Sequence, residues 1–97
     1  LESPRDHGMA PFWNTPLDAQ LRTARVHTLV ATGVSLNVGI PGLVIGAIDR
    51  GYRVVVATDC VAGVPTAYGR SVLEHSLGQL AALARADDLI ASWSVTA

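Results

Sequence analysis

The side chains that could take part in a reaction gather around one turn, residues 33–40, with the sequence GVSLNVGI. Ser35 is the only hydroxyl in this turn and Asn37 is its only amide. Ser35 lacks the G-x-S-x-G pattern that presents a serine nucleophile, and no base stands near it in the sequence. Asn37 is better suited to a cap or a turn than to a ligand contact, because its side chain bonds nearby backbone groups. The turn therefore offers no strong nucleophile.

Cysteine and histidine, the other reactive side chains, are outside this turn. Cys60 is the single cysteine, which excludes an internal disulfide, and a free cysteine is more often a small buried residue than a reactive one. We expect His27 at the entry of a strand, His75 on a helix surface, and only His7 as a candidate member of a site. No metal site and no cofactor are predicted.

Composition and charge restrict the class of protein. With 49% hydrophobic residues among 97, the chain is typical of one small globular domain whose apolar surface meets a partner, and we expect a homo-oligomer. The net charge of −1 argues against nucleic acid and anionic membranes as partners. No apolar run reaches the roughly 20 residues of a membrane span, and no signal-peptide pattern occurs. The predicted location is the reducing cytoplasm.

The hydrophobic pattern places the turn between a strand and a helix. Residues 26–33 form a nearly continuous apolar run, typical of a strand that is buried on both faces of a parallel sheet. Pro41 is tolerated only in the first turn of a helix, so the helix is predicted to begin near residues 38–40. Gly51 is a suitable left-handed residue for its end.

A second strand is predicted at residues 53–58, RVVVAT, because three β-branched valines favour a strand. Strand, helix and strand make a βαβ unit, and ligands collect at the carboxyl ends of such strands. Residues 59–65 are predicted as a loop at the same edge as residues 33–40. We therefore expect these two segments to be the walls of one crevice.

The flanking segments have weaker patterns. Residues 1–14 show no sustained period, whereas residues 15–25 predict a short amphipathic helix that begins with a threonine cap. Another helix is predicted to begin near Thr66. The segment that follows it is open to two interpretations. Helical propensity favours one long helix, and the alternative is a helix, a short strand at residues 81–85 and a last helix capped by Asp87.

The order of these segments resembles the carboxyl-terminal half of the isochorismatase-like cysteine hydrolases. The pattern of that family is F-x-x-T-x-L, then a strand ending in T-G-V-x-x-N-V-C, then a helix and G-Y-x-V-x-V-x-x-D-A-V-A. The residues that fit in register are Phe12, Thr15, Leu17, Thr32, Gly33, Val34, Asn37, Val38, Gly51, Tyr52, Val54, Val56, Asp59, Val61 and Ala62. The likeness covers approximately residues 9–93, and it favours helix, strand and helix for the carboxyl-terminal segment.

The resemblance implies an α/β class, with a Rossmann-like three-layer α/β/α fold around a parallel sheet. Residues 1–97 would then be a single partial domain, in which 1–14 is an irregular arm and 15–93 an αβαβαβα core. The resemblance also implies a non-proline cis peptide between Val34 and Ser35.

The family hydrolyses amides or vinyl ethers with an aspartate, a lysine and a cysteine nucleophile at a helix start, where the helix dipole favours the thiolate. The resemblance places Gly39 at the position of the cysteine. The aspartate belongs to a strand that these residues do not include, and the lysine position falls near Arg5, Asp6 and His7. An arginine there could hold an anion, but it cannot exchange protons as a lysine does.

Two functions remain open on this reading. The first is a non-catalytic small-molecule-binding or subunit-interaction module, with ligand contacts from Val34, Ser35, Asn37 and Val38 around the vacated nucleophile position at Gly39. The second is an active amide or vinyl-ether hydrolase whose full-length form supplies a non-standard nucleophile. Gly39 favours the first, and whether the chain is an enzyme stays open.

Overall fold

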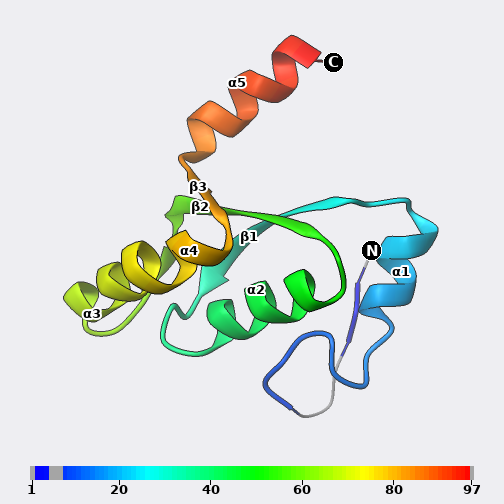
Figure 1. The fold of residues 1–97 in the computed structure, drawn as a ribbon, viewed down its shortest axis with the longest axis horizontal. Coiled ribbons are helices and arrows are strands. Elements are labelled where there is room, and N and C mark those ends of the chain that lie inside the picture. The colour runs from blue at the N-terminus through cyan, green and yellow to red at the C-terminus, as the bar shows by residue number, and fades with distance from the viewer. Residues whose placement is uncertain (1, 5–7, 97) are drawn as a thin grey trace.

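Three parallel strands form the sheet around which the chain folds (Figure 1). In the computed structural model, which describes residues 2–4 and 8–96, the strands are β1 (Thr28–Val34), β2 (Arg53–Ala62) and β3 (Ala82–Ala84). Their order is β1-β2-β3, and both neighbouring pairs are parallel. Parallel neighbours need a crossover connection, and helical segments supply both crossovers. The predicted α/β class with a parallel sheet is confirmed.

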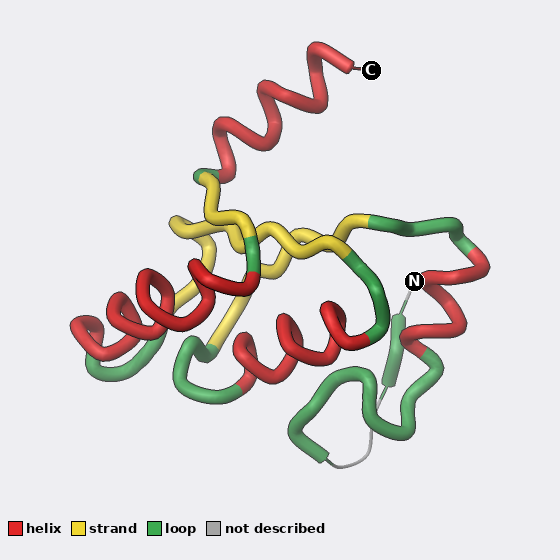
Figure 2. The backbone as a smooth tube through the Cα atoms, in the orientation of Figure 1, coloured by secondary structure: helices red, strands yellow, loops and turns green. Residues whose placement is uncertain are grey.

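Helices lie on both sides of this sheet (Figure 2). They are α1 (Leu17–Thr23), α2 (Gly39–Asp49), α3 (Thr66–Ser71), the π-helical segment η1 (Val72–Leu77), α4 (Gly78–Leu80) and α5 (Ala86–Thr96). α2 and the continuous rod of α3, η1 and α4 cover one side of the sheet, whereas α5 leaves from the other side and extends away from the rest of the fold. Helices, sheet and helix therefore follow one another in the order of an α/β/α fold.

The hydrophobic core lies between the sheet and the helices on its covered side. On β2, the side chains of Val54 and Val56 are buried, whereas the intervening Val55 is only half-buried. The same alternation follows from the pleat of any strand that buries one face. The core cluster contains Phe12, Ala31, Leu36, Ile40, Val44, Ala47, Tyr52, Val54, Val56, Leu73 and Leu77.

β1 is less buried than its sequence suggests. It was predicted to be covered on both faces, but Ala31 is its only buried residue, and Thr28 and Thr32 are exposed. The reason is that the covering helices pack on one face only, so Thr28, Thr32 and Val34 on the other face are exposed. The predicted bounds, 26–33, are also early, because the ladder with β2 begins at Thr28 and ends at Val34.

The bounds of α2 agree with the local signals in the sequence. The helix begins at Gly39, so Pro41 lies in its first turn as predicted. It ends at Asp49, and Gly51 follows with a φ of 89°, the left-handed conformation expected of that residue. Ile40, Val44 and Ala47 recur at helical spacing and bury the face of α2 that meets the sheet.

The described part of residues 1–14 has no helix or strand, as expected of an irregular arm, but it contributes to the core. Phe12 is 5% exposed and stacks on Tyr52, with ring centroids 6.0 Å apart. The Tyr52 hydroxyl donates a hydrogen bond of 2.6 Å to a carboxylate oxygen of Asp18 on α1. Arg50 lies over the Phe12 ring, 4.8 Å from its centroid. These contacts join the arm, α1 and the end of α2.

The threonine expected to cap the first helix lies just before it. The helix spans Leu17–Thr23 instead of 15–25, and Thr15 accepts a 3.4 Å hydrogen bond from the Leu17 N–H with its hydroxyl oxygen. That bond joins residues two apart, as in a serine or threonine turn. The division of the chain into an arm and a core stays a prediction.

The carboxyl-terminal segment forms a helix, a strand and a helix, which decides between the two sequence interpretations. β3 pairs with β2 through Val55 and Ala82, and this pairing outweighs the helical propensity of the segment. The cap of α5 differs from the prediction of Asp87. Asp59, on β2, accepts a 2.9 Å hydrogen bond from the N–H of Ala86, the first residue of α5, because the β2–β3 pairing brings the two together.

Asp59 makes this helix start sensitive to pH. The hydrogen bond from the Ala86 N–H holds the pKa of Asp59 below its ordinary value, and Arg85, 3.5 Å from the carboxylate, acts in the same direction. The folded-state pKa is thus lower than the unfolded one, so the carboxylate stabilises the fold above about pH 4, and this stability is lost as the pH falls through the folded pKa.

We expect Asp59→Asn to lower the thermal unfolding midpoint at pH 7, and the difference from the wild type to shrink as the pH is lowered from about 4 to about 2. The matched control is Asp49→Asn, at an exposed carboxylate with no recorded partner among the described residues, which should unfold like the wild type throughout. If the difference in unfolding midpoint between Asp59→Asn and the wild type stayed the same at acid pH, the role given to Asp59 would be contradicted.

Candidate functional site

The turn after β1 leads directly into the first turn of α2. The Val34–Ser35 peptide is cis, as the family resemblance implies. In the first turn of α2, the Ile40 N–H donates to the Ser35 carbonyl at 2.9 Å and the Gly42 N–H to the Val38 carbonyl at 3.0 Å. The N–H groups of Val38 and Gly39 donate to no other residue that the structure describes. Two donors at the positive end of α2 therefore remain available.

Gly39 is the first residue of α2 and has space for a side chain. A Cβ atom built on Gly39 would lie 3.4 Å from the Val34 carbonyl oxygen and 3.9 Å from its carbon, which are ordinary van der Waals contacts. A cysteine at position 39 therefore needs no movement of the backbone.

Asn37 connects the turn to the segment that follows β2. Its Nδ2 donates to the Val64 carbonyl at 2.7 Å, and its Oδ1 accepts from the Val64 N–H at 2.8 Å. The Leu36 N–H donates to the Ala62 carbonyl at 2.7 Å beside this pair. The sequence predicted a cap or turn role for Asn37, in which its side chain bonds backbone groups. These contacts are of that kind, but the backbone partner is Val64, which is distant in sequence. The two walls of the expected crevice are thus bonded to each other at this point.

The second wall is a strand over most of its length, and not a loop from Asp59 onward. β2 continues to Ala62, because its ladder with β1 resumes at Val61 after an irregularity. While β1 advances from Ala31 to Gly33, β2 advances from Val56 to Val61, so the residues between bulge out of the ladder. Cys60 lies in this bulge and is exposed, which corrects the expectation of a buried cysteine.

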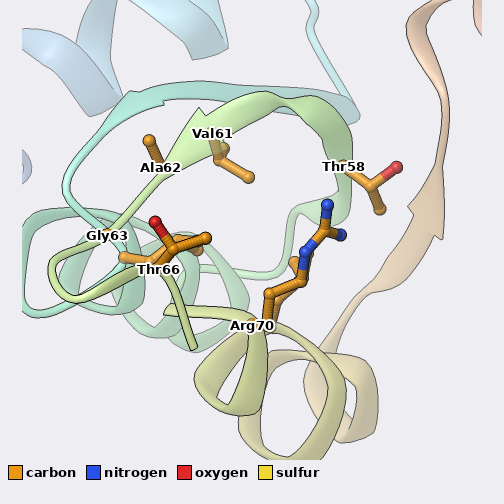
Figure 3. Close-up of a pocket in the computed structure, with 8 residues that line it drawn as sticks. Thr58, Val61, Ala62, Gly63, Thr66 and Arg70 are labelled. Atoms are coloured by element: carbon orange, nitrogen blue, oxygen red, sulfur yellow. The ribbon is translucent and has the colours of Figure 1, made fainter. Parts of the chain in front are cut away.

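A small pocket opens between the end of β2 and the helical rod (Figure 3). Its volume is about 100 Å³, and it is lined by Leu36, Thr58, Val61, Ala62, Gly63, Thr66, Arg70 and Leu73. The Arg70 side chain reaches from α3 toward β2 and lies between Thr66 and Thr58. The residues from 61 to 63 form one wall, so the second segment does border a pocket.

The five residues predicted for the site lie together in the turn but outside this pocket. Val34 and Val38 are exposed, with 77% and 49% of their surface accessible, and Ser35, Asn37 and Gly39 are half-buried. No residue of the five lines the pocket; the turn contributes Leu36 instead. Their binding role stays a prediction.

Sequence reasoning missed Thr66 and Arg70. They lie four residues apart near the start of α3, so they share a helix face. Their four-residue spacing, directly after the segment 59–65, was the feature of the sequence that could have identified them. Arg5, Asp6 and His7, which fall at the family's lysine position, lie outside the described residues.

The remaining histidines have the expected positions. His27 precedes β1 and His75 lies in η1, and both are exposed. In the described part of the chain, no cluster of three or more histidine, cysteine, aspartate or glutamate side chains could hold a metal ion. No helix in that part is long and apolar enough to cross a membrane.

Known proteins share this fold and part of its sequence. The chain is 39% identical over 67 residues to the ureidoacrylate amidohydrolase RutB of Methylorubrum extorquens, which covers 67% of this chain and 26% of the relative. An isochorismatase family protein from Burkholderia thailandensis has 31% identity and a TM-score of 0.81 over 86% of this chain and 44% of its own. An isochorismatase-like hydrolase from Alkaliphilus metalliredigens shares the fold, with a TM-score of 0.85 at 24% identity, over 93% of this chain and 54% of its own.

The chain therefore spans about half, or less, of the length of these proteins. A model of the isochorismatase domain matches residues 5–88, which is most of the sequence. The match includes the strand, turn and helix around Gly39 and the pocket residues of β2 and α3. This protein thus belongs to the isochorismatase family.

Proposed function

We propose that this chain is a non-catalytic member of its family that binds a small molecule at the turn between β1 and α2. The observation that supports this most directly is Gly39. The family motif T-G-V-x-x-N-V-C has its nucleophile at this position, and a glycine has no side chain with which to attack a carbonyl carbon.

The backbone of the turn supports binding without catalysis. The N–H groups of Val38 and Gly39 lie at the amino end of an eleven-residue helix and have no acceptor among the described residues. Such donors favour an anion or a carbonyl oxygen. A ligand oxygen held there would satisfy both donors.

The competing hypothesis is a hydrolase with a different nucleophile. A relative 39% identical to this chain is named as an amidohydrolase, which favours this alternative. Two side chains near the turn could serve, Ser35 and Cys60. Neither has a hydrogen-bonded base among the described residues, and Cys60 lies exposed in the β2 bulge. Within the described residues, both side chains thus lack the activating base that nucleophilic catalysis requires.

A turnover assay separates the two hypotheses. We expect the wild-type protein to hydrolyse none of a panel of small amides, ureidoacrylate and isochorismate-type vinyl ethers above the uncatalysed rate. Any activity gained by Gly39→Cys should be absent from Gly42→Cys, in which the cysteine stands one turn later on the same helix with no atom within 4 Å of its Cβ. Robust turnover by the wild type would reject the non-catalytic function.

The same two variants test whether the turn still favours negative charge. In a Cys60→Ser background, the Gly39→Cys thiol should react with iodoacetamide at pH 7 up to about tenfold faster than the Gly42→Cys thiol, because the helix start lowers a thiol pKa by a unit or more. The rates are measured by mass spectrometry of the alkylated protein. Equal rates would show that the donors at Val38 and Gly39 do not stabilise an anion.

A further inference from the structure

The pocket between β2 and α3 lies apart from the turn that carries the proposed function. The hydrogen bonds between Asn37 and Val64 stand between them, and Leu36 is the only residue of the turn in the pocket wall. The pocket therefore has its own chemistry, which is set by one cation, two hydroxyls and apolar side chains.

The cation is Arg70, which points toward β2 across the pocket (Figure 3). Among the residues that the structure describes, two arginines form ion pairs: Arg22 with Asp18, and Arg85 with Asp59. Arg70 has no carboxylate within ion-pair distance in that part of the chain. Its guanidinium is thus a permanent charge beside Val61 and Leu73 without a counterion among the described residues.

The hydroxyls come from Thr66 and Thr58. Thr66 lies one helical turn before Arg70 on α3, and its hydroxyl has no recorded partner among the described residues. The Thr58 hydroxyl makes only a long bond, 3.4 Å, to the Ala84 carbonyl. Thr66 can therefore donate to an acceptor in the pocket, whereas the Thr58 hydroxyl points away from Arg70 and toward β3 (Figure 3).

The position of this face of α3 is fixed by a contact between two glycines. A Cβ atom on Gly69 would lie 3.0 Å from the Gly63 Cα, so the helix backbone rests directly on the end of β2. Gly69 is buried by this contact, and the adjacent Arg70 is held beside the β2 bulge. The guanidinium is thus anchored at its base, although its side chain is accessible to solvent.

Size and charge define the ligand. A volume of about 100 Å³ is well below the roughly 300–1,000 Å³ of pockets that hold drug-sized ligands, so the ligand has only a few heavy atoms. A single cation balances a single negative charge, and the planar fork of a guanidinium matches a carboxylate. We propose that the pocket binds a small monocarboxylate of the size of acetate. Arg70 holds its two oxygens, Thr66 donates to one of them, and Val61 and Leu73 face its apolar end.

The test is a titration of the ¹⁵N-labelled protein with sodium acetate at constant ionic strength, followed by NMR. We expect saturable shifts of the Gly63 and Thr66 amides and of the Arg70 Nε–H, with a dissociation constant in roughly the millimolar range for so small a ligand. Acetamide has nearly the same shape without the charge, and sulfate carries two charges. Each should bind at least about tenfold more weakly than acetate. Acetamide loses the charge-assisted hydrogen bonds to Arg70, and sulfate leaves one of its two negative charges unbalanced.

Two variants locate the ligand. Arg70→Gln should weaken acetate binding by at least about tenfold, and the matched control Arg53→Gln, at an exposed arginine at the other end of β2, should leave it unchanged. The unfolding midpoints of both variants are compared with the wild type to exclude a folding defect. Shifts that do not saturate, that acetamide reproduces equally, or that survive in Arg70→Gln would overturn the proposal.

The NMR titration also distinguishes binding in the Arg70 pocket from binding at the turn between β1 and α2. Acetate shifts confined to the Val38 and Gly39 amides would support the proposed function and overturn the pocket. Shifts confined to Gly63, Thr66 and Arg70 would support the pocket even if the turnover assay finds the protein to be an active hydrolase.

Discussion

Leu77→Ala is expected to lower the free energy of unfolding by about 2–5 kcal/mol, the cost of a buried leucine truncated to alanine. Leu77 has no exposed surface and is among the largest fully buried side chains of the core, together with Val44 and Val56. It lies in η1, where the helical rod packs against α2 and the sheet. The methyl groups removed would leave a cavity, because a close-packed core relaxes only partly around it.

The measurement for Leu77 is urea unfolding followed by circular dichroism at one protein concentration. The matched control is Leu80→Ala, because Leu80 lies three residues later on the same rod and is 47% exposed. This control should change the unfolding free energy by less than about 0.5 kcal/mol. Equal losses in the two variants would mean that Leu77 does not hold the rod against the core.

Gly63→Ala is expected to destabilise the protein by about 3 kcal/mol, near the upper end of the usual overpacking cost. A Cβ atom at Gly63 would lie 2.9 Å from the Gly69 Cα and 3.0 Å from both the Asn37 Oδ1 and the Leu36 Cβ. None of these three atoms is the free end of a flexible side chain. The Gly69 Cα belongs to the helix backbone, and Asn37 is held by two hydrogen bonds to Val64.

Gly42→Ala is the control for this substitution, and we expect the opposite sign. Gly42 lies inside α2, and a Cβ atom built there has no neighbour within 4 Å. Alanine should therefore stabilise the helix by about 0.5–1 kcal/mol, because it loses less backbone entropy than glycine. Urea unfolding measures both variants. A neutral Gly63→Ala would show that β2 and α3 can separate without loss, and it would remove the basis for the fixed position of Arg70.

The β1–α2–β2 unit could be predicted from the sequence because its signals are local. Pro41 and Gly51 specify the start and end of α2 through their own backbone preferences, and the valines of residues 53–58 favour a strand over a helix. The position of the turn, and the absence of a side chain at Gly39, follow from the same stretch. These features depend on residues a few positions apart, so periodicity and propensity suffice to find them.

Only the tertiary structure decided the features that depend on distant partners. Residues 82–84 form a strand because β2 pairs with them, although their own propensity is helical. Asp59 caps α5, and Asn37 binds Val64, over 27 residues of sequence in each case. The bulge that exposes Cys60 follows from the register between two strands.

The candidate site also has one part that the sequence predicts and one part that only the tertiary structure shows. The sequence by itself determined which residues form the turn and that position 39 has no side chain. The pocket around Arg70 was decided by the tertiary structure, because it exists only where the Gly63–Gly69 contact brings α3 against the end of β2. The physical reason is that a pattern along the chain records the preference of each residue for its neighbours, whereas a cavity is formed by packing between segments that the pattern does not relate.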